Sequence, residues 1–276
     1  MRRTFLLAAT LMACGPSTPA ESPHESSSGT ATASARSGEA AIDFCGKSWP
    51  KSTTRVDCHD GKVTDLSPLA GLSELEILDV GQIQHDATDW KELTPISAKD
   101  LSPLAGLRKL RVLSLYGVQV SDLKPLAGLK SLEKLILDFA QVSDLAPIRS
   151  MTGLKSLSLQ AVPTTDFAPL TSATGLEDLG LESTSFSDTR LLQKLPNLVN
   201  LRITSTAVTD LTLIAKLPNL EYLVASGMNL DFAQLVGCKS LKNVGALGVD
   251  EKSVASLKKL KKARPELSIM NIELGG

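Results

Sequence analysis

The sequence DLSPLAGL occupies residues 65–72 and occurs a second time, unchanged, at residues 100–107. Degraded copies of the same phrase begin at Asp122, Asp144 and Asp166. The opening aspartate continues without the rest of the phrase at Asp188, Asp210 and Asp231. Between Asp100 and Asp210 every step is 22 residues. A fixed period of this length predicts a stacked-repeat fold, in which each unit packs only against its neighbours.

Each period contains the pattern of a short strand followed by a tight helical turn. In one unit, Leu132, Leu135 and Leu137 end in the alternation that is typical of a strand with one buried face. Pro125 and Gly128 bracket a helical turn, because proline has a preset φ at the first helical position and glycine suits a left-handed exit. The unit is therefore predicted to run from strand through turn to helical turn and back.

The same apolar positions recur along the chain and define about eight units. Their central strand residues are Leu78, Leu113, Leu135, Leu157, Leu179, Leu201, Leu223 and Val244. This pattern resembles the leucine-rich repeat family, in particular its 22-residue class of internalins and phosphatase-regulatory subunits. The resemblance covers residues 56–272. It implies an α/β fold, a right-handed curved solenoid with a parallel sheet on the concave face and 3₁₀ or short helical turns on the convex face.

One column of the repeat departs from the family pattern. The family usually has asparagine three residues after the last strand leucine, where its side chain satisfies backbone groups. In this sequence that column reads Ile83, Val118, Ala140, Val162, Thr184, Thr206 and Met228. We therefore expect the turn after each strand to satisfy its backbone in another way.

The aspartate that opens each unit has two interpretations. Carboxylates that repeat in register could chelate calcium. An aspartate directly before a helical turn also accepts backbone N–H bonds and suits the positive end of the turn. We favour the second interpretation and expect neither a metal nor a cofactor.

The N-terminus has the order of a bacterial export signal. Two arginines precede the apolar run at residues 5–12, which is too short to cross a bilayer as a permanent span. The sequence LMAC at residues 11–14 resembles the bacterial lipobox. This implies a signal peptide over residues 1–13 and a lipid on Cys14, with ordinary cleavage nearby as the alternative. Residues 14–41 are rich in Ser, Thr and Ala without apolar periodicity, which predicts a disordered tether.

The repeats, predicted over residues 63–248, need closed ends because a terminal unit has a neighbour on one side only. Residues 42–62 are predicted to form an N-terminal cap. A Cys45–Cys58 disulfide would close this cap, since exported proteins can keep disulfides. Two free buried thiols are the alternative.

The C-terminal cap is predicted over residues 249–276. Asp250 can cap a helix that ends near Ala263, and an alternating segment after it indicates a final strand. The basic residues of this helix are Lys252, Lys258, Lys259, Lys261, Lys262 and Arg264. We expect them to form a solvated face, with contact to anionic headgroups as the alternative. Cys238 aligns with an inward leucine position and is expected to be a buried thiol.

The first unit is longer than the others. Its step to Asp100 is 35 residues, 13 more than the period of 22, and the excess falls near residues 84–99. A longer convex loop is the expected structure, and a binding loop is the alternative. The insertion also contains a weak candidate for a metal site, formed by His85, Asp86 and Asp89.

Composition and motifs argue against several functions. The formal net charge of −1 becomes −3 without Arg2 and Arg3, from 27 basic and 30 acidic residues. This charge offers no global attraction to nucleic acid. The three histidines are His24, His59 and His85, and the sequence contains no HExxH, GxSxG, Walker or CxxC motif. We therefore do not expect an enzyme.

Side chains beside the strand leucines alternate away from the core and line the predicted concave face. With neighbouring strands about 4.8 Å apart, they form a contiguous row of Tyr116, Asp138, Gln160 and Glu182. The candidate binding surface adds Lys134, Ile136, Phe139, Asp178, Arg202 and Tyr222. Aromatic and arginine residues are enriched at interface hot spots, and the acidic members favour a basic partner. Ordinary solvent-facing strand residues are the alternative.

These features together predict a non-catalytic, monomeric lipoprotein of the bacterial cell envelope that binds a protein partner. Its lipid would hold it at the outer membrane, facing the periplasm or the surface. A regulatory subunit of an envelope enzyme is one alternative, by analogy with the phosphatase-regulatory repeats. A structural protein that tethers envelope layers through its basic cap is the other.

Overall fold

The structure is a computed structural model, and it describes residues 40–58, 63–81 and 97–270. These residues belong to one compact unit that spans residues 37–276. The predicted signal peptide, Cys14, and the tether up to residue 39 lie outside the described residues. Most of the insertion near residues 84–99 lies outside them as well.

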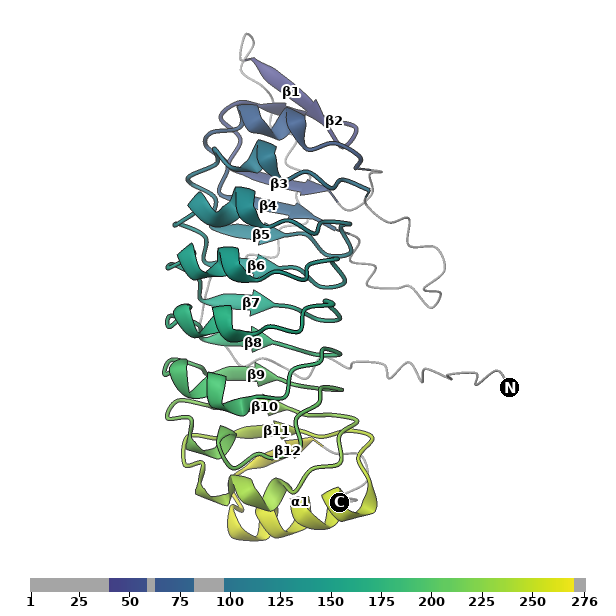
Figure 1. Ribbon diagram of the computed structural model, residues 1–276, viewed down its shortest axis with the longest axis vertical. Coiled ribbons are helices and arrows are strands. Elements are labelled where there is room, and N and C mark those ends of the chain that lie inside the picture. The colour runs from purple at the N-terminus through teal and green to yellow at the C-terminus, as the bar shows by residue number, and fades with distance from the viewer. Residues whose placement is uncertain (1–39, 59–62, 82–96, 271–276) are drawn as a thin grey trace, which may run out of the picture. The chain divides into compact units, whose positions relative to one another are not determined.

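Ten parallel strands form the main sheet, and their order in the sheet follows their order in the chain (Figure 1). The strands are β3 Arg55–Cys58, β4 Ile77–Val80, β5 Val112–Ser114, β6 Lys134–Ile136, β7 Ser156–Ser158, β8 Asp178–Gly180, β9 Asn200–Arg202, β10 Tyr222–Val224, β11 Asn243–Gly245 and β12 Ser268–Met270. Consecutive strands pair in register, so that Leu113 lies beside Leu135 and Leu135 beside Leu157. The predicted central strand residues, from Leu78 to Val244, all lie in strands.

A 3₁₀ turn follows each repeat strand on the other side of the leucines. These turns are η1 Ser67–Gly71, η3 Ser102–Leu104, η4 Lys124–Gly128, η5 Ala146–Ser150, η6 Ala168–Ser172, η7 Thr189–Lys194, η8 Ile214–Lys216 and η9 Phe232–Gly237. Proline opens the first five of them, as predicted from its preset φ. The fold is the predicted solenoid, with the parallel sheet on one face and short helical turns on the other (Figure 1).

The repeated aspartate binds the backbone at the start of the 3₁₀ turns and, in the unit of η8, two residues before the turn begins. In all eight units its Oδ1 accepts a hydrogen bond from the backbone N–H two residues later, at N···O distances between 2.6 and 3.1 Å. These aspartates are Asp65, Asp100, Asp122, Asp144, Asp166, Asp188, Asp210 and Asp231. The carboxylate thus satisfies a donor that the short helix leaves unpaired, which is the structural role that we favoured over calcium binding.

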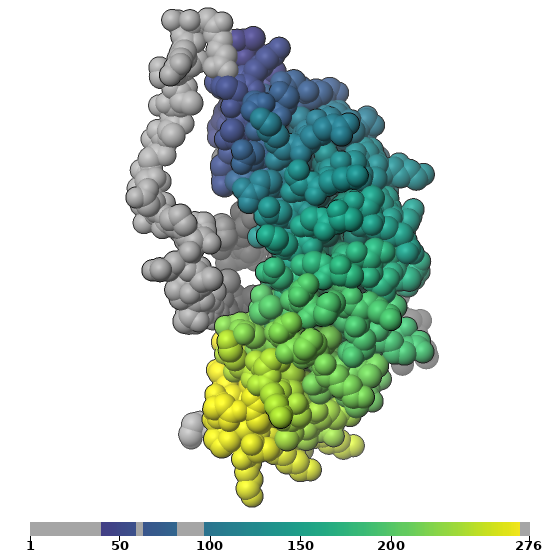
Figure 2. Space-filling model, turned by 90° about the vertical axis from the view of Figure 1, so that its left-hand side faces the viewer, coloured from purple at the N-terminus to yellow at the C-terminus, as the bar shows by residue number. Residues whose placement is uncertain are grey.

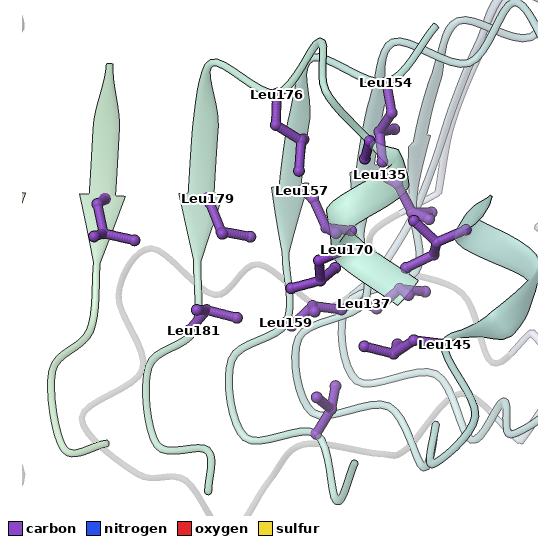
Figure 3. Close-up of a cluster of buried hydrophobic side chains, with 14 of the residues drawn as sticks. Leu135, Leu137, Leu145, Leu154, Leu157, Leu159, Leu170, Leu176, Leu179 and Leu181 are labelled. Atoms are coloured by element: carbon purple, nitrogen blue, oxygen red, sulfur yellow. The ribbon is translucent and has the colours of Figure 1, made fainter. Parts of the chain in front are cut away.

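The hydrophobic core is a stack of leucines between the sheet and the 3₁₀ turns. Leu135, Leu157 and Leu179 come from three adjacent strands and are fully buried together with Leu170 of η6 (Figure 3). The space-filling view keeps the order of the chain from the purple hairpin to the yellow helix, so each unit covers its neighbours (Figure 2). No unit has a complete core of its own, since its leucines are enclosed by those of the units beside it.

The turn after each strand satisfies its backbone groups with its own hydrogen bonds, which replace those that the asparagine of the family pattern would make. The second residue after the last strand leucine has a positive φ between 55° and 69° at Gly117, Phe139, Ala161, Ser183, Ser205 and Gly227. The next N–H then donates back to the last strand leucine or isoleucine, for example from Ala140 to Leu137 at 2.9 Å. Thr184 and Thr206 add a hydroxyl bond to the same carbonyls, at 2.6 and 2.8 Å.

The N-terminal cap is a small antiparallel hairpin, β1 Ala41–Phe44 and β2 Lys47–Pro50. A disulfide joins Cys45 in its turn to Cys58 at the end of β3, with Cα atoms 6.0 Å apart. The predicted pairing of these two cysteines is therefore present. The indole N–H of Trp49 in β2 donates to the carbonyl of Phe44 in β1 at 3.0 Å, and β1 packs against η1 of the first repeat.

The C-terminal cap is helix α1, Glu251–Ala263, followed by the edge strand β12. Asp250 caps the helix by accepting a bond from the Ser253 N–H at 2.8 Å, as predicted. Two serines of the helix then accept bonds from the last repeat, Ser253 from the Leu230 N–H and Ser256 from the Phe232 N–H, both at 2.9 Å. The helix thus ends the stack with hydrogen bonds as well as with apolar side chains.

Two of the basic residues in this cap bind backbone carbonyls. Arg264 donates to the carbonyls of Cys238 and Leu241, at 2.7 and 3.0 Å, and Lys261 donates to those of Pro265 and Leu267. The sequence had led us to expect that all the basic residues of this cap are solvated. The bonds of Arg264 and Lys261 show that two of them are not. The Cys238 thiol is free and buried, in agreement with its predicted place in the core.

We expect Leu157→Ala to lower the free energy of unfolding by about 2–5 kcal/mol, because it opens a cavity among close-packed leucines. Urea unfolding followed by circular dichroism measures this loss. The matched control is Ser156→Ala in the same strand, which is half-buried and has no place in the leucine stack. Equal losses in the two variants would contradict the stacked core.

Candidate binding surface

The predicted row of Tyr116, Asp138, Gln160 and Glu182 lies just beyond the ends of strands β5 to β8. Backbone bonds hold its members in register: the Gly117 N–H donates to Asp138 and the Phe139 N–H to Gln160, each at 2.8 Å. The structure therefore brings the four side chains of the row together. Their exposure differs from the expectation, because Asp138 is 9% and Glu182 only 5% exposed.

Asp138 is buried because it links two repeats. Its Oδ1 accepts a bond from the Gln160 N–H at 2.9 Å, one repeat along the stack. The same column uses hydroxyls further on, where Thr204 accepts from the Ser226 N–H and Ser226 from the Leu247 N–H. Several side chains of this column thus bind the backbone of the next repeat, and only part of the row is exposed.

Glu182 is buried beneath an arginine from the next repeat. Arg202 Nε lies 2.8 Å from Glu182 Oε1, and its Nη1 lies 2.9 Å from Asp178 Oδ1. Gly180 makes room for this arrangement, because a Cβ there would lie 2.7 Å from Arg202 Nη2 and 2.8 Å from Glu182 Oε2. The guanidinium of Arg202 therefore binds two carboxylates above the end of β8, where Gly180 has no side chain.

Asp138, Asp178, Glu182 and Arg202 form an acidic cluster, in which the three carboxylates outnumber the one cation. Burial raises the pKa of Asp138, although bonds from Ser158 and Gln160 act against it. Burial also raises the pKa of Glu182 against the pull of Arg202, and its Oε2 is buried without a hydrogen-bond partner. Burial alone would lower the pKa of Arg202, but Asp178 and Glu182 outweigh it and raise this pKa. The cluster therefore favours an additional positive charge nearby.

An aromatic pair adjoins this acidic cluster. The rings of Tyr116 and Phe139 meet edge to face, with centroids 5.2 Å apart and planes at 62°. Phe139 is 37% exposed and has φ 63°, while the equivalent positions that the structure describes, from residue 117 to residue 248, hold glycine, alanine or serine. Tyr116 is half-buried, and burial raises the pKa of its hydroxyl.

The remaining predicted site residues fall into two groups. Lys134 is exposed and Ile136 half-buried; both lie in β6, the strand whose C-terminal end leads to Phe139. Tyr222 opens β10, which is five strands from β5 and hence about 24 Å from the aromatic pair at 4.8 Å per strand. The structure therefore does not bring Tyr222 to the same place as Tyr116.

Sequence reasoning missed a second column, which lies just before the strands begin. It reads Glu76, Arg111, Glu133, Lys155, Glu177, Val199, Glu221 and Lys242. Backbone bonds near 2.8 Å connect each member to the next, so the side chains form a row along this edge of the sheet. The signal was present in the sequence as a charge of alternating sign, one residue before each strand.

No helix in the described part of the chain is long and apolar enough to span a bilayer. Within the same residues, no group of three or more His, Cys, Asp or Glu side chains is arranged to hold a metal ion. The weak metal candidate of His85, Asp86 and Asp89 lies outside the described residues, and so does His59.

Comparison with known proteins gives similarity at the level of structure. No protein-family model matches this sequence, and no curated protein matches it. Internalin C2 of Listeria monocytogenes superposes with a TM-score of 0.62 and 22% identity, over 74% of this chain and 87% of that chain. This chain has the leucine-rich-repeat fold.

Two further leucine-rich-repeat structures are similar to about the same degree. The internalin inlF of Listeria monocytogenes gives a TM-score of 0.59 and 24% identity, over 78% of this chain and 66% of that chain. A leucine-rich-repeat protein of Leptospira interrogans gives 0.60 and 21%, over 78% of this chain and 59% of that chain. This chain therefore spans less than two thirds of the length of these two proteins.

The raised pKa of Asp138 predicts a pH dependence of stability. Between the ordinary aspartate pKa of about 3.9 and the raised value, the folded state binds more protons than the unfolded state. The free energy of unfolding contributed by Asp138 therefore falls as the pH rises through this window. Asp138→Asn removes the titration and keeps an oxygen for the Gln160 N–H, so the wild type should lose stability relative to this variant.

Urea unfolding at several pH values measures this difference, and Asp100→Asn is its control. Bonds from Ser102 lower the pKa of Asp100, so its stabilisation is present above the ordinary pKa and lost as the pH falls. The two variants should therefore differ from the wild type with opposite slopes. Parallel profiles for Asp138→Asn and the wild type would show that burial does not shift this carboxyl.

Proposed function

We propose that this chain is a non-catalytic, monomeric module that binds a protein partner in the bacterial cell envelope, where a lipid on Cys14 attaches it to the membrane. Its binding surface is centred on Tyr116 and Phe139 and extends over Gln160 to the Asp178–Arg202 pair. It needs neither a cofactor nor a nucleic acid. The observation that carries this proposal is the backbone conformation of Phe139.

Phe139 occupies a position where folding alone disfavours it. A left-handed conformation costs a residue with a Cβ about 1–2 kcal/mol, which is why glycine suits this turn. The ring contributes little to the leucine core, since more than a third of it is exposed and its ring contact is with Tyr116. Backbone strain and exposed aromatic rings both concentrate at binding sites. A partner that covers Phe139 would account for a residue that the fold does not require.

The charges beside the aromatic pair favour a basic partner. Asp138, Asp178 and Glu182 face a single guanidinium, that of Arg202, so the cluster carries excess negative charge. Such a surface accelerates association with a positively charged partner and makes binding sensitive to salt. The half-exposed Asp178 is the carboxylate in this cluster that a partner reaches most easily.

Two observations support the place in the envelope. The LMAC sequence at residues 11–14 resembles a lipobox, and a short apolar run precedes it. The Cys45–Cys58 disulfide suits a compartment that is not reducing, because cytosolic thiols are normally kept reduced. Export and lipidation together would place the repeats outside the cytoplasm.

We expect Phe139→Gly to abolish partner capture while leaving the protein at least as stable as the wild type. Glycine relieves the left-handed backbone, which adds up to about 1 kcal/mol to the free energy of unfolding. Loss of an interface hot spot lowers affinity by about 30-fold or more. Affinity capture from envelope extracts, together with urea unfolding, measures both effects.

The control for this experiment is Ala161→Gly, at the same turn position one repeat later. It relieves the same backbone strain without removing an aromatic ring, so its capture should equal that of the wild type. If Phe139→Gly captures the partner as well as Ala161→Gly does, the aromatic pair is not the binding centre.

The lipid anchor is tested separately with radiolabelled palmitate in a bacterial host. We expect the full-length chain to incorporate the label and to fractionate with membranes, and Cys14→Ser to lose both properties. Cys238→Ser is the matched control, because that thiol is buried in the repeats and should not affect labelling. Label retained by Cys14→Ser would contradict the anchor.

A further inference from the structure

The row of charged residues that precedes the strands alternates in sign along the stack. It runs Glu76, Arg111, Glu133, Lys155, Glu177, Val199, Glu221 and Lys242. Neighbouring members form ion pairs, with Arg111 Nη2 3.2 Å from Glu133 Oε2 and Lys242 Nζ 2.7 Å from Glu221 Oε1. The Arg111 bond, aided by Lys155, lowers the pKa of Glu133. Opposite charges in adjacent rungs thus stabilise one another along this edge.

Val199 breaks the alternation at the rung where a cation would follow. The residue before it in the row is Glu177 and the residue after it is Glu221, so one carboxylate lies on each side of an apolar side chain. In the described part of the chain, Glu177 has no ion pair with any residue, whereas Glu221 is paired with Lys242 on its far side. The break therefore leaves a place for one positive charge.

A surface hollow lies at this break. Its volume is about 310 Å³, and it is lined by Glu177, Asn197, Val199, Asn219, Glu221 and Ser240. The two asparagines are fixed by their own bonds, since Asn197 Nδ2 donates to the Thr174 carbonyl and Asn219 Nδ2 to that of Pro196. Each of these bonds uses one of the two N–H groups of its amide, and the amide oxygen can act as an acceptor.

We propose that this hollow receives the side chain of a lysine or arginine from a protein partner. The occupant would place its cationic group between Glu177 and Glu221, where it supplies the missing charge of the row. Its methylene stem would lie on Val199, as the stems of long basic side chains lie on apolar surface. The proposal rests on the proposed function in one respect, that the partner is a protein.

The lining explains why the occupant is a cation. Two carboxylates, two amide oxygens and a serine hydroxyl offer acceptors, which lysine and arginine can use because they carry only donors. An anionic group would meet like charge from both glutamates. A wholly apolar group would cover these acceptors without bonding to them, which costs free energy.

Nuclear magnetic resonance of the repeat protein tests this with Nα-acetyl-lysine methylamide as the probe. We expect saturable shifts of the Val199 methyl groups and of the Asn197 and Asn219 side-chain amides. The norleucine analogue, which has the stem without the ammonium, should bind about fivefold more weakly or worse, as expected for loss of an exposed ion pair. Equal binding of the two probes would overturn the proposal.

Variants of the row make the test specific. Val199→Lys supplies the missing cation from within the chain and should abolish the probe-induced shifts, while Val199→Leu should keep them. Glu177→Gln should weaken the lysine probe by about fivefold. Glu76→Gln, in the same row but away from the hollow, should not. The unfolding midpoint of each variant shows that it is folded.

The outcomes separate this inference from the proposed function. Shifts that persist in Val199→Lys, or that are equally affected by Glu76→Gln, would overturn the hollow as a cation site, whatever the capture experiment gives. Phe139→Gly should leave the lysine probe unaffected, because Phe139 lies beyond the opposite ends of the strands. If the protein binds the lysine probe but Phe139→Gly still captures the partner, only the proposed binding surface around Phe139 is contradicted.

Discussion

Burial of leucines between one repeat and the next is the interaction on which the rest of the structure depends. Leu135, Leu157 and Leu179 are enclosed because the strands pair in register, so a strand shifted by one residue would turn them outward. This requirement fixes the 22-residue period, and the period in turn aligns every other column. The repeated aspartates, the charged row and the candidate binding row recur at regular intervals because the leucines recur at regular intervals.

The regular columns make their exceptions informative. At the left-handed turn position of the described repeats, the other residues are glycine, alanine and serine, whereas Phe139 adds a large exposed ring. At the start of the strands, charges alternate until Val199 interrupts them beside a hollow. In each case the stack provides several copies of the same local environment. A residue that the environment does not favour points to a requirement other than folding.

Much of the architecture follows from local patterns that sequence alone reveals. The leucine spacing predicted the strands, proline and the repeated aspartate predicted the 3₁₀ turns, and Asp250 predicted the final helix. The Cys45–Cys58 pair was predicted as well, since an exported protein can keep a disulfide that closes the cap. These features need only the period and the chemistry of single residues.

The candidate surface was less accessible to prediction because its side chains depend on neighbours about 22 residues away. Alternation along the strands predicted that Asp138 and Glu182 line an exposed face, but Asp138 is buried against the Gln160 backbone and Glu182 against Arg202. The left-handed backbone of Phe139 could not be read from a column of mixed residue types. Similarly, the serine bonds from α1 to the last repeat require the helix position to be known.

The uniform interface between repeats has a consequence for how such a chain can change over generations. A point substitution in the leucine stack must suit two neighbouring units, so single changes there are constrained. Gain of a whole 22-residue block adds both faces of a unit together, and loss of a block removes both. In either case matching surfaces stay in contact. DLSPLAGL at residues 100–107 and DLKPLAGL at residues 122–129 lie one period apart and differ at one position, as such a duplication would leave them. Length is therefore the property that this architecture can vary most freely.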